Sequence, residues 1–158
     1  MTPEGPVLHS ELAALEFLVG NWRGQGRGSY PGSEPFEYEE ELTFSHAGKP
    51  VLVYAMRTWL NPSRASHAEN GFWRCRDHSR VDAVAAHATG HVEISSGSVE
   101  GLSLLLSSSS VSAWTGAKDV VSLGRRLRLE DGVLNDQIEM QAVGQVRQAH
   151  TVAVLRRV

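Results

Sequence analysis

Cysteine is almost absent from this chain of 158 residues, in which Cys75 is the only one. A single thiol excludes an internal disulfide and a cluster of thiolate metal ligands, and it is typical of a reducing compartment. It also excludes the C-x-x-C-H motif through which c-type cytochromes attach their prosthetic group. A prosthetic group of that kind is therefore expected to be held without covalent bonds.

Long apolar runs and an excess of basic residues are also missing. No stretch approaches the roughly 20 apolar residues that cross a bilayer as a helix, and the N-terminal segment lacks the basic start and apolar run of a signal peptide. The 15 Lys and Arg residues are outnumbered by 18 Asp and Glu residues, which gives a net charge of −3. No basic face is therefore expected for nucleic acid or an anionic membrane, and we expect a cytoplasmic protein.

The length fits a single domain over residues 1–158. Hydrophobic residues make up 41% of the chain, which suffices for a core. One segment has the pattern of a helix. Ser10 is a candidate N-cap for residues 11–18, which carry apolar residues on one side, and Gly20 would end the helix.

From Trp22 onward the chain consists of short extended runs between turn residues. The alternation is clearest in residues 36–45, where aromatic and leucine side chains alternate with glutamates and Glu40 interrupts the apolar side. Turns are predicted at several points, among them Ser96-Gly97 and Asp131-Gly132. Further strands are predicted over residues 51–60, 65–75, 81–87, 91–95, 101–106, 111–115, 120–129, 133–142 and 146–157.

About ten strands joined by tight turns predict an all-β fold with a short N-terminal helix. An antiparallel meander of this kind leaves no exposed edge if it closes into a barrel, as in the lipocalins. A closed barrel of this strand number encloses more space than its own side chains fill, so we expect one small ligand inside it. The fold class does not define which ligand.

A glycine-rich segment begins the extended part of the chain. Gly24, Gly26 and Gly28 fall on one face of a predicted strand. They let the strand bend at a barrel corner packed by Trp22, or they let a bulky group approach the backbone closely. The sequence leaves both interpretations open.

Two groups among the seven histidines are candidate ligands. His87 and His91 have the spacing of a metal pair on a helix, but a predicted turn separates them and no third ligand is evident, which disfavours zinc. His150 lies in the middle of the last strand, on the predicted face of Val146, Val152 and Val154. It is either a hydrogen-bonded core residue or the axial ligand of a haem, which needs one imidazole nitrogen from the protein.

Motifs spread over the chain together resemble the nitrobindin family. They are, in order, G-x-W-x-G-x-G from Gly20 to Gly26, Tyr30-Pro31, Pro35-Phe36-x-Tyr38-x-Glu40-Glu41, His46-x-Gly48-x-Pro50, Arg57-Thr58-Trp59, His67-Ala68-Glu69-x-Gly71-Phe72-Trp73-Arg74, Ala86-His87-x-Thr89-Gly90-x-Val92-Glu93, Met140-x-Ala142-Val143-Gly144 and His150 with Leu155-Arg156-Arg157-Val158. No single motif is decisive, but their order and spacing cover the chain from Leu12 to Val158.

The resemblance implies a ten-stranded barrel related to fatty-acid-binding proteins, with non-covalent ferric haem b at one mouth. Members of the family bind nitric oxide and isomerise peroxynitrite to nitrate. Their proximal iron ligand is a histidine of the last strand, which is His150 here, so the resemblance makes His150 both the metal ligand and the catalytic residue. The implied partners are haem and small reactive nitrogen species, and a homodimer is left open.

Other residues are candidates for contact with haem through the same resemblance. The glycine-rich strand is expected to shape the haem environment, and His67 is either a residue of the pocket or a hydrogen-bonded histidine at a strand start. Gly32 stands where the family commonly has a threonine at the haem edge, so it offers only its backbone. These candidates are Gly20, Trp22, Gly24, Gly26, Gly32 and His67.

A haem-free barrel that carries a small apolar ligand is the alternative. It is favoured by Gly32, by Asp136, which stands where the family has a tyrosine, and by the polar run Ser107–Ser110. A purely structural or interaction module is disfavoured because no adhesive surface is evident in the sequence.

Overall fold

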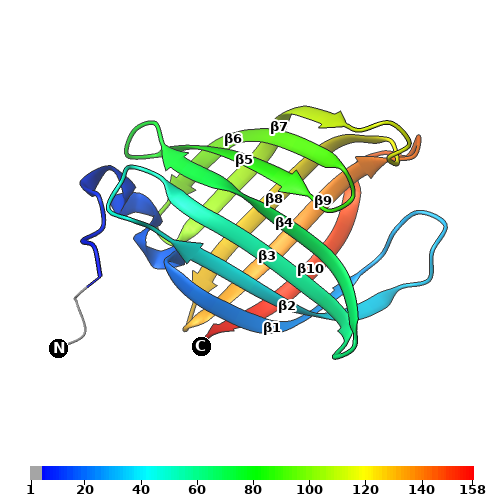
Figure 1. Ribbon diagram of the computed structural model, residues 1–158, viewed down its shortest axis with the longest axis horizontal. Coiled ribbons are helices and arrows are strands. Elements are labelled where there is room, and N and C mark those ends of the chain that lie inside the picture. Colours follow the sequence, from blue (N-terminus) through cyan, green and yellow to red (C-terminus); the bar gives the residue numbers. More distant parts are fainter. Residues whose placement is uncertain (1–4) are drawn as a thin grey trace.

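The computed structural model describes residues 5–158, which form one short helix and ten strands (Figure 1). The helix is the 3₁₀ helix η1 (Ser10–Leu18). The strands are β1 (Gly20–Gly28), β2 (Phe36–Ser45), β3 (Leu52–Asn61), β4 (Arg64–Cys75), β5 (Arg80–His87), β6 (His91–Glu100), β7 (Ser103–Ala113), β8 (Val120–Glu130), β9 (Val133–Ala142) and β10 (Gln148–Arg157).

The strands close into an antiparallel barrel, which confirms the predicted all-β fold class. Each strand pairs with its neighbours in the chain, and β1 closes the ring by pairing with β10, from Trp22 opposite Arg157 to Gly28 opposite Thr151. Successive side chains of a strand point to opposite faces, so the alternation read from β2 places its aromatic and leucine residues inside. Because every strand has two neighbours, the sheet has no free edge.

Helix η1 and the side chains beneath it fill one end of the barrel. Leu12, Leu15 and Leu18 are fully buried in a core that includes Trp22 and Trp73. The indole Nε1 of Trp22 donates a hydrogen bond of 2.8 Å to the carbonyl of Leu18, which ties the helix to β1. In Figure 1, η1 lies at the left end of the barrel, and the β1–β2 and β7–β8 loops lie at the right end.

The ends of some elements differ from the prediction. His9 rather than Ser10 caps η1, because its Nδ1 accepts a hydrogen bond from the backbone N–H of Glu11, and Ser10 is already helical. The first strand starts at Gly20, and the last starts at Gln148. Within residues 5–158 no helix is long and apolar enough to cross a membrane.

The serine-rich part of the chain was predicted wrongly. The predicted strands 101–106 and 111–115 are one strand, β7, and the predicted turn Ser96-Gly97 lies inside β6. Strands β6 and β7 pair from His91 opposite Ala113 to Glu100 opposite Ser103. The ladder is made by backbone groups, so serines that favour turns locally stay extended when a full-length partner strand is present.

Candidate functional site

A cavity of about 520 Å³ lies at the loop end of the barrel. Tyr30 and Lys118 line it from the β1–β2 and β7–β8 loops, and inward side chains of the strands line the rest. Along β5 the inward residues change from Val81, which packs in the core, to Ala83 and Ala85, which line the cavity. Small side chains at these positions leave room that larger ones would fill.

His150 lines this cavity from a β-bulge in β10. The pairing with β9 shifts between Ala149 and Thr151, so that His150 is an extra residue in the ladder. Neighbouring residues of a regular strand point to opposite faces. The bulge instead allows both His150 and Thr151 to line the cavity.

The imidazole of His150 is held in one tautomer. Its Nδ1 lies 2.7 Å from the carbonyl oxygen of Ser29, and because a carbonyl only accepts, Nδ1 carries the proton and Nε2 keeps its lone pair. The amide of Ser29 in turn donates to the carbonyl of His150 at 2.9 Å. The ring of Tyr30 lies edge-on to the imidazole, with 6.2 Å between centroids. A histidine fixed in this way through Nδ1 is typical of a metal ligand that binds through Nε2.

The predicted face of His150 was wrong. Val146, Val152 and Val154 are exposed, whereas Leu155 is fully buried. The extra residue of the bulge shifts the inside–outside alternation by one. His150 therefore does not share a face with the valines that follow it.

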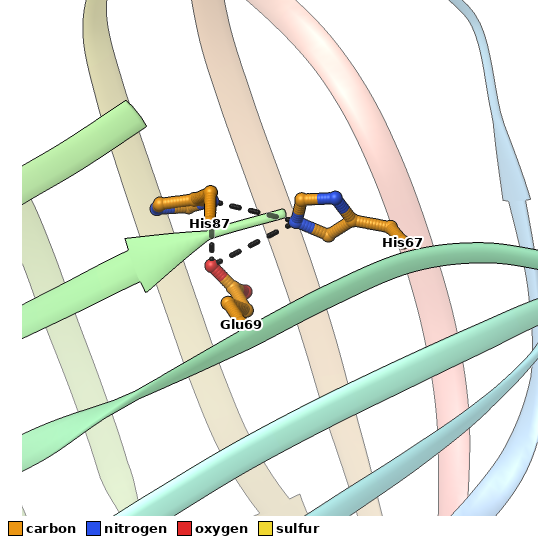
Figure 2. A group of neighbouring side chains, drawn as sticks. All are labelled: His67, Glu69 and His87. Carbon is orange, nitrogen blue, oxygen red and sulfur yellow. Dashed lines mark hydrogen bonds and ion pairs between the residues drawn. The ribbon is translucent and has the colours of Figure 1, made fainter. Parts of the chain in front are cut away.

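A second group of polar side chains lies across the barrel. The strand order separates β5 from β10 by four strands on either side. His67 and Glu69 from β4 and His87 from β5 point toward one another (Figure 2), and all three line the cavity. The Nδ1 of His87 lies 2.9 Å from Oε2 of Glu69 and 3.4 Å from Nε2 of His67.

The charges in this group are fixed by mutual pairing. Burial raises the pKa of Glu69, but the hydrogen bond from His87 and the nearby positive charges outweigh this and hold it at about 2. Burial lowers the pKa of His87, but its partners Glu69 and Glu93 raise it to about 10. His87 is therefore a cation and Glu69 an anion near neutral pH. Burial lowers the pKa of His67, which is neutral.

Arg125 of β8 is a further buried cation beside this group. Its Nε donates to Oδ1 of Asp136 at 2.8 Å, its Nη2 donates to the other oxygen of that carboxylate, and its Nη1 donates to the hydroxyl of Tyr54. Burial and the neighbouring Asp136 raise the pKa of Glu40 well above its usual range, which favours the protonated form. Asp136 is thus the partner of Arg125 in the barrel wall.

We expect the Glu69–His87 pair to stabilise the fold most between about pH 4.5 and 6.5. Glu69 has a pKa of about 2 in the folded chain against an ordinary 4.5, so as the pH falls below 4.5 the unfolded chain takes up its proton first and the stabilisation is lost. His87 has a pKa of about 10 against an ordinary 6.5, so as the pH rises above 6.5 the unfolded chain loses its proton first, with the same result.

Thermal melts of the parent and of Glu69→Gln at a series of pH values measure this effect. The difference in melting temperature should be largest between about pH 4.5 and 6.5 and should shrink on both sides. Glu130→Gln, which removes an exposed carboxylate, is the matched control and should follow the parent. A constant difference for Glu69→Gln across the pH range would contradict the assignment.

Of the candidate haem-binding residues, His67 and His150 line the cavity, and the others do not. A Cβ atom at Gly24 would lie 1.9 Å from the carbonyl oxygen of Val154, and one at Gly26 would lie 2.4 Å from the ring of Tyr38. The structure therefore supports the packing interpretation of this strand. The residues outside the lining are Gly20, Trp22, Gly24, Gly26 and Gly32.

His87 and His91 do not form the metal pair that their spacing suggested. The Nε2 of His91 lies 2.7 Å from the carbonyl oxygen of Lys118, and its Nδ1 lies 2.8 Å from the hydroxyl of Thr89. Both nitrogens are thus engaged, Nε2 with the β7–β8 loop and Nδ1 with the turn between β5 and β6. His87 instead faces Glu69. The sequence did not single out Glu69 as a candidate ligand. Its position two residues after His67, and therefore on the same face of the strand, was the available signal.

The fold and the cavity define a ligand-binding β-barrel with one histidine oriented for a metal. Residues 11–157 match the family model described as "THAP4-like, heme-binding beta-barrel domain". Similar proteins include peroxynitrite isomerase 2 of Mycobacterium avium, 43% identical over 95% of this chain and 96% of the relative, and peroxynitrite isomerase of Nocardia farcinica, 40% identical over 96% and 93%. The crystal structure of Rv2717c from M. tuberculosis superposes with a TM-score of 0.89 at 38% identity, over 96% of this chain and 99% of that one.

This chain belongs to the THAP4-like haem-binding β-barrel family, and its relatives over the full length are named peroxynitrite isomerases. The predicted resemblance to the nitrobindins is confirmed by this match.

Proposed function

We propose that the chain binds one ferric haem b in its cavity through His150 and isomerises peroxynitrite to nitrate. The observation that carries this proposal is the hydrogen bond from Nδ1 of His150 to the carbonyl of Ser29. It leaves Nε2 as the nitrogen with a free lone pair on a side chain that lines the cavity. The names of the full-length relatives support the reaction.

The residues present fit a haem. The cavity volume of about 520 Å³ lies within the range of about 300–1,000 Å³ that is common for small-molecule sites. Aromatic and apolar side chains suit the faces of a porphyrin, and the imidazole suits iron. Those lining side chains include Phe36, Met56, Trp73, Trp114, Leu106 and Ile138.

The chain's own part in the reaction is binding and orientation. His150 would ligate the iron through Nε2, and the carbonyl of Ser29 makes the imidazole a stronger ligand by accepting from Nδ1. His67 lines the same cavity as a neutral imidazole and would face a small ligand bound there. Bound ferric haem would supply the Lewis acid for peroxynitrite isomerisation and an iron that binds nitric oxide.

The haem-free carrier is the rival, because the same apolar lining suits a small apolar ligand. Two of the features that favoured it have another explanation in the structure: Asp136 pairs with Arg125, and the serine run lies in β7, which pairs with β6. Gly32 lies outside the cavity lining. The oriented His150 has no role in a carrier of apolar ligands, and this favours haem.

Titration of the purified protein with hemin tests the proposal. We expect uptake of about one hemin per chain, with a strong Soret band of a histidine-ligated ferric haem, because one imidazole and one cavity provide one site. A titration that shows only the spectrum of free hemin would favour the apolar carrier.

A further inference from the structure

Three ligand atoms converge on the wall opposite His150. They are Nε2 of His67, Oε2 of Glu69 and Nδ1 of His87 (Figure 2). The distances between them are 2.9 Å from Glu69 to His87, 3.4 Å from His67 to His87 and 4.0 Å from His67 to Glu69. Two nitrogens and one oxygen ligand bound tetrahedrally to zinc at about 2.0–2.1 Å lie about 3.4 Å apart. The three atoms are therefore spaced as such a set requires after shifts of about half an ångström.

An ion pair alone does not account for this arrangement. The pair between Glu69 and His87 needs one imidazole, yet a second one, His67, directs its Nε2 to 3.4 Å from the nitrogen that already serves Glu69. Two imidazoles and one carboxylate around a common point are the ligand set of catalytic zinc sites and of non-haem iron sites.

Polar groups lie behind two of the three ligands, His87 and Glu69. The Nε2 of His87 and Oε2 of Glu93 are buried, lack a hydrogen-bond partner and lie 3.8 Å apart. A carboxylate behind the second nitrogen of a histidine is a recurrent feature of metal ligation. The other oxygen of Glu69, Oε1, accepts from the hydroxyl of Tyr54 at 2.8 Å, which leaves Oε2 to face the two imidazoles.

We propose that His67, Glu69 and His87 form a binding site for one divalent transition-metal ion, of which zinc is the probe, separate from His150. The ion takes the place of the proton that His87 shares with Glu69, and that proton leaves to solvent. Because all three residues line the cavity, the fourth position of a tetrahedral ion opens toward it for water or a small anion. None of its three ligands is the proposed haem ligand His150, so the site can be tested in the chain without haem.

Calorimetric titration of the full chain, freed of haem and metal, with zinc chloride tests this proposal. We expect one zinc ion per chain, and an affinity at least about 10-fold weaker in His67→Ala and in His87→Ala. Glu93→Gln, which keeps all three ligands, should weaken binding by about 10-fold because it removes the carboxylate that lies 3.8 Å behind Nε2 of His87. His78→Ala, at an exposed histidine, is the matched control and should bind zinc like the parent.

His150→Ala distinguishes this site from the proposed haem ligand, and it should keep the zinc affinity of the parent. Cobalt(II) bound to the parent should show the visible spectrum of tetrahedral nitrogen and oxygen coordination. This measurement uses the parent alone, so it does not depend on whether the variants fold. The proposal is overturned by no zinc uptake, by an octahedral cobalt spectrum, by zinc affinity that survives both His67→Ala and His87→Ala, or by its loss in His150→Ala alone.

Discussion

His150→Ala is expected to bind hemin at least about 100-fold more weakly than the parent while the barrel stays folded. Loss of a group that only orients a metal ligand costs about 10–100-fold in affinity, so loss of the ligand itself should cost at least the upper end of that range. The side chain is partly exposed at the loop end, away from the packed end beneath η1. Hemin titration gives the affinity, and circular dichroism checks the fold.

The matched control for this variant is His78→Ala, which removes an exposed histidine from the β4–β5 turn. It should bind hemin like the parent. Equal hemin affinity in His150→Ala and the parent would remove His150 from the haem site.

Arg125→Ala is expected to destabilise the fold by about 3–5 kcal/mol, because it leaves the buried carboxylate of Asp136 without its partner. For a domain of this size that corresponds to a melting temperature lower by on the order of 10 °C. Thermal or urea unfolding gives the difference. The double variant Arg125→Leu with Asp136→Leu should recover much of the loss, because it leaves no unpaired charge in the wall.

Arg128→Ala is the control for Arg125→Ala on the same strand. Arg128 is 58% exposed and pairs with the equally exposed Glu130, and exposed pairs contribute only about 0–1 kcal/mol. A similar loss of stability in both variants would contradict the structural role assigned to the buried pair.

Much of the fold could be predicted because local patterns and topology agree. The alternation of residues 36–45 defined the inside face of β2, and turn residues such as Asp131-Gly132 separated β8 from β9. The serines of β6 and β7 misled the prediction, because serine is common in turns and the partner strand that keeps it extended lies beyond the local segment.

The site was predictable only in part. The resemblance singled out His150, but the bulge that brings it to the cavity depends on the pairing of β10 with β9 and has no signal in the local alternation. Arg125 meets Tyr54 across 71 positions of the sequence, a contact that only the closed barrel creates. Glu40, which interrupts an apolar face, was the local sign of a polar group inside the barrel.

Stopped-flow measurement of peroxynitrite decay tests whether the chain isomerises peroxynitrite through His150. The ferric, hemin-loaded protein should accelerate the decay and direct the product toward nitrate. His150→Ala, supplied with the same hemin, should lose this effect. Decay at the rate of buffer with free hemin, or equal acceleration by His150→Ala, would contradict a peroxynitrite isomerase that works through His150.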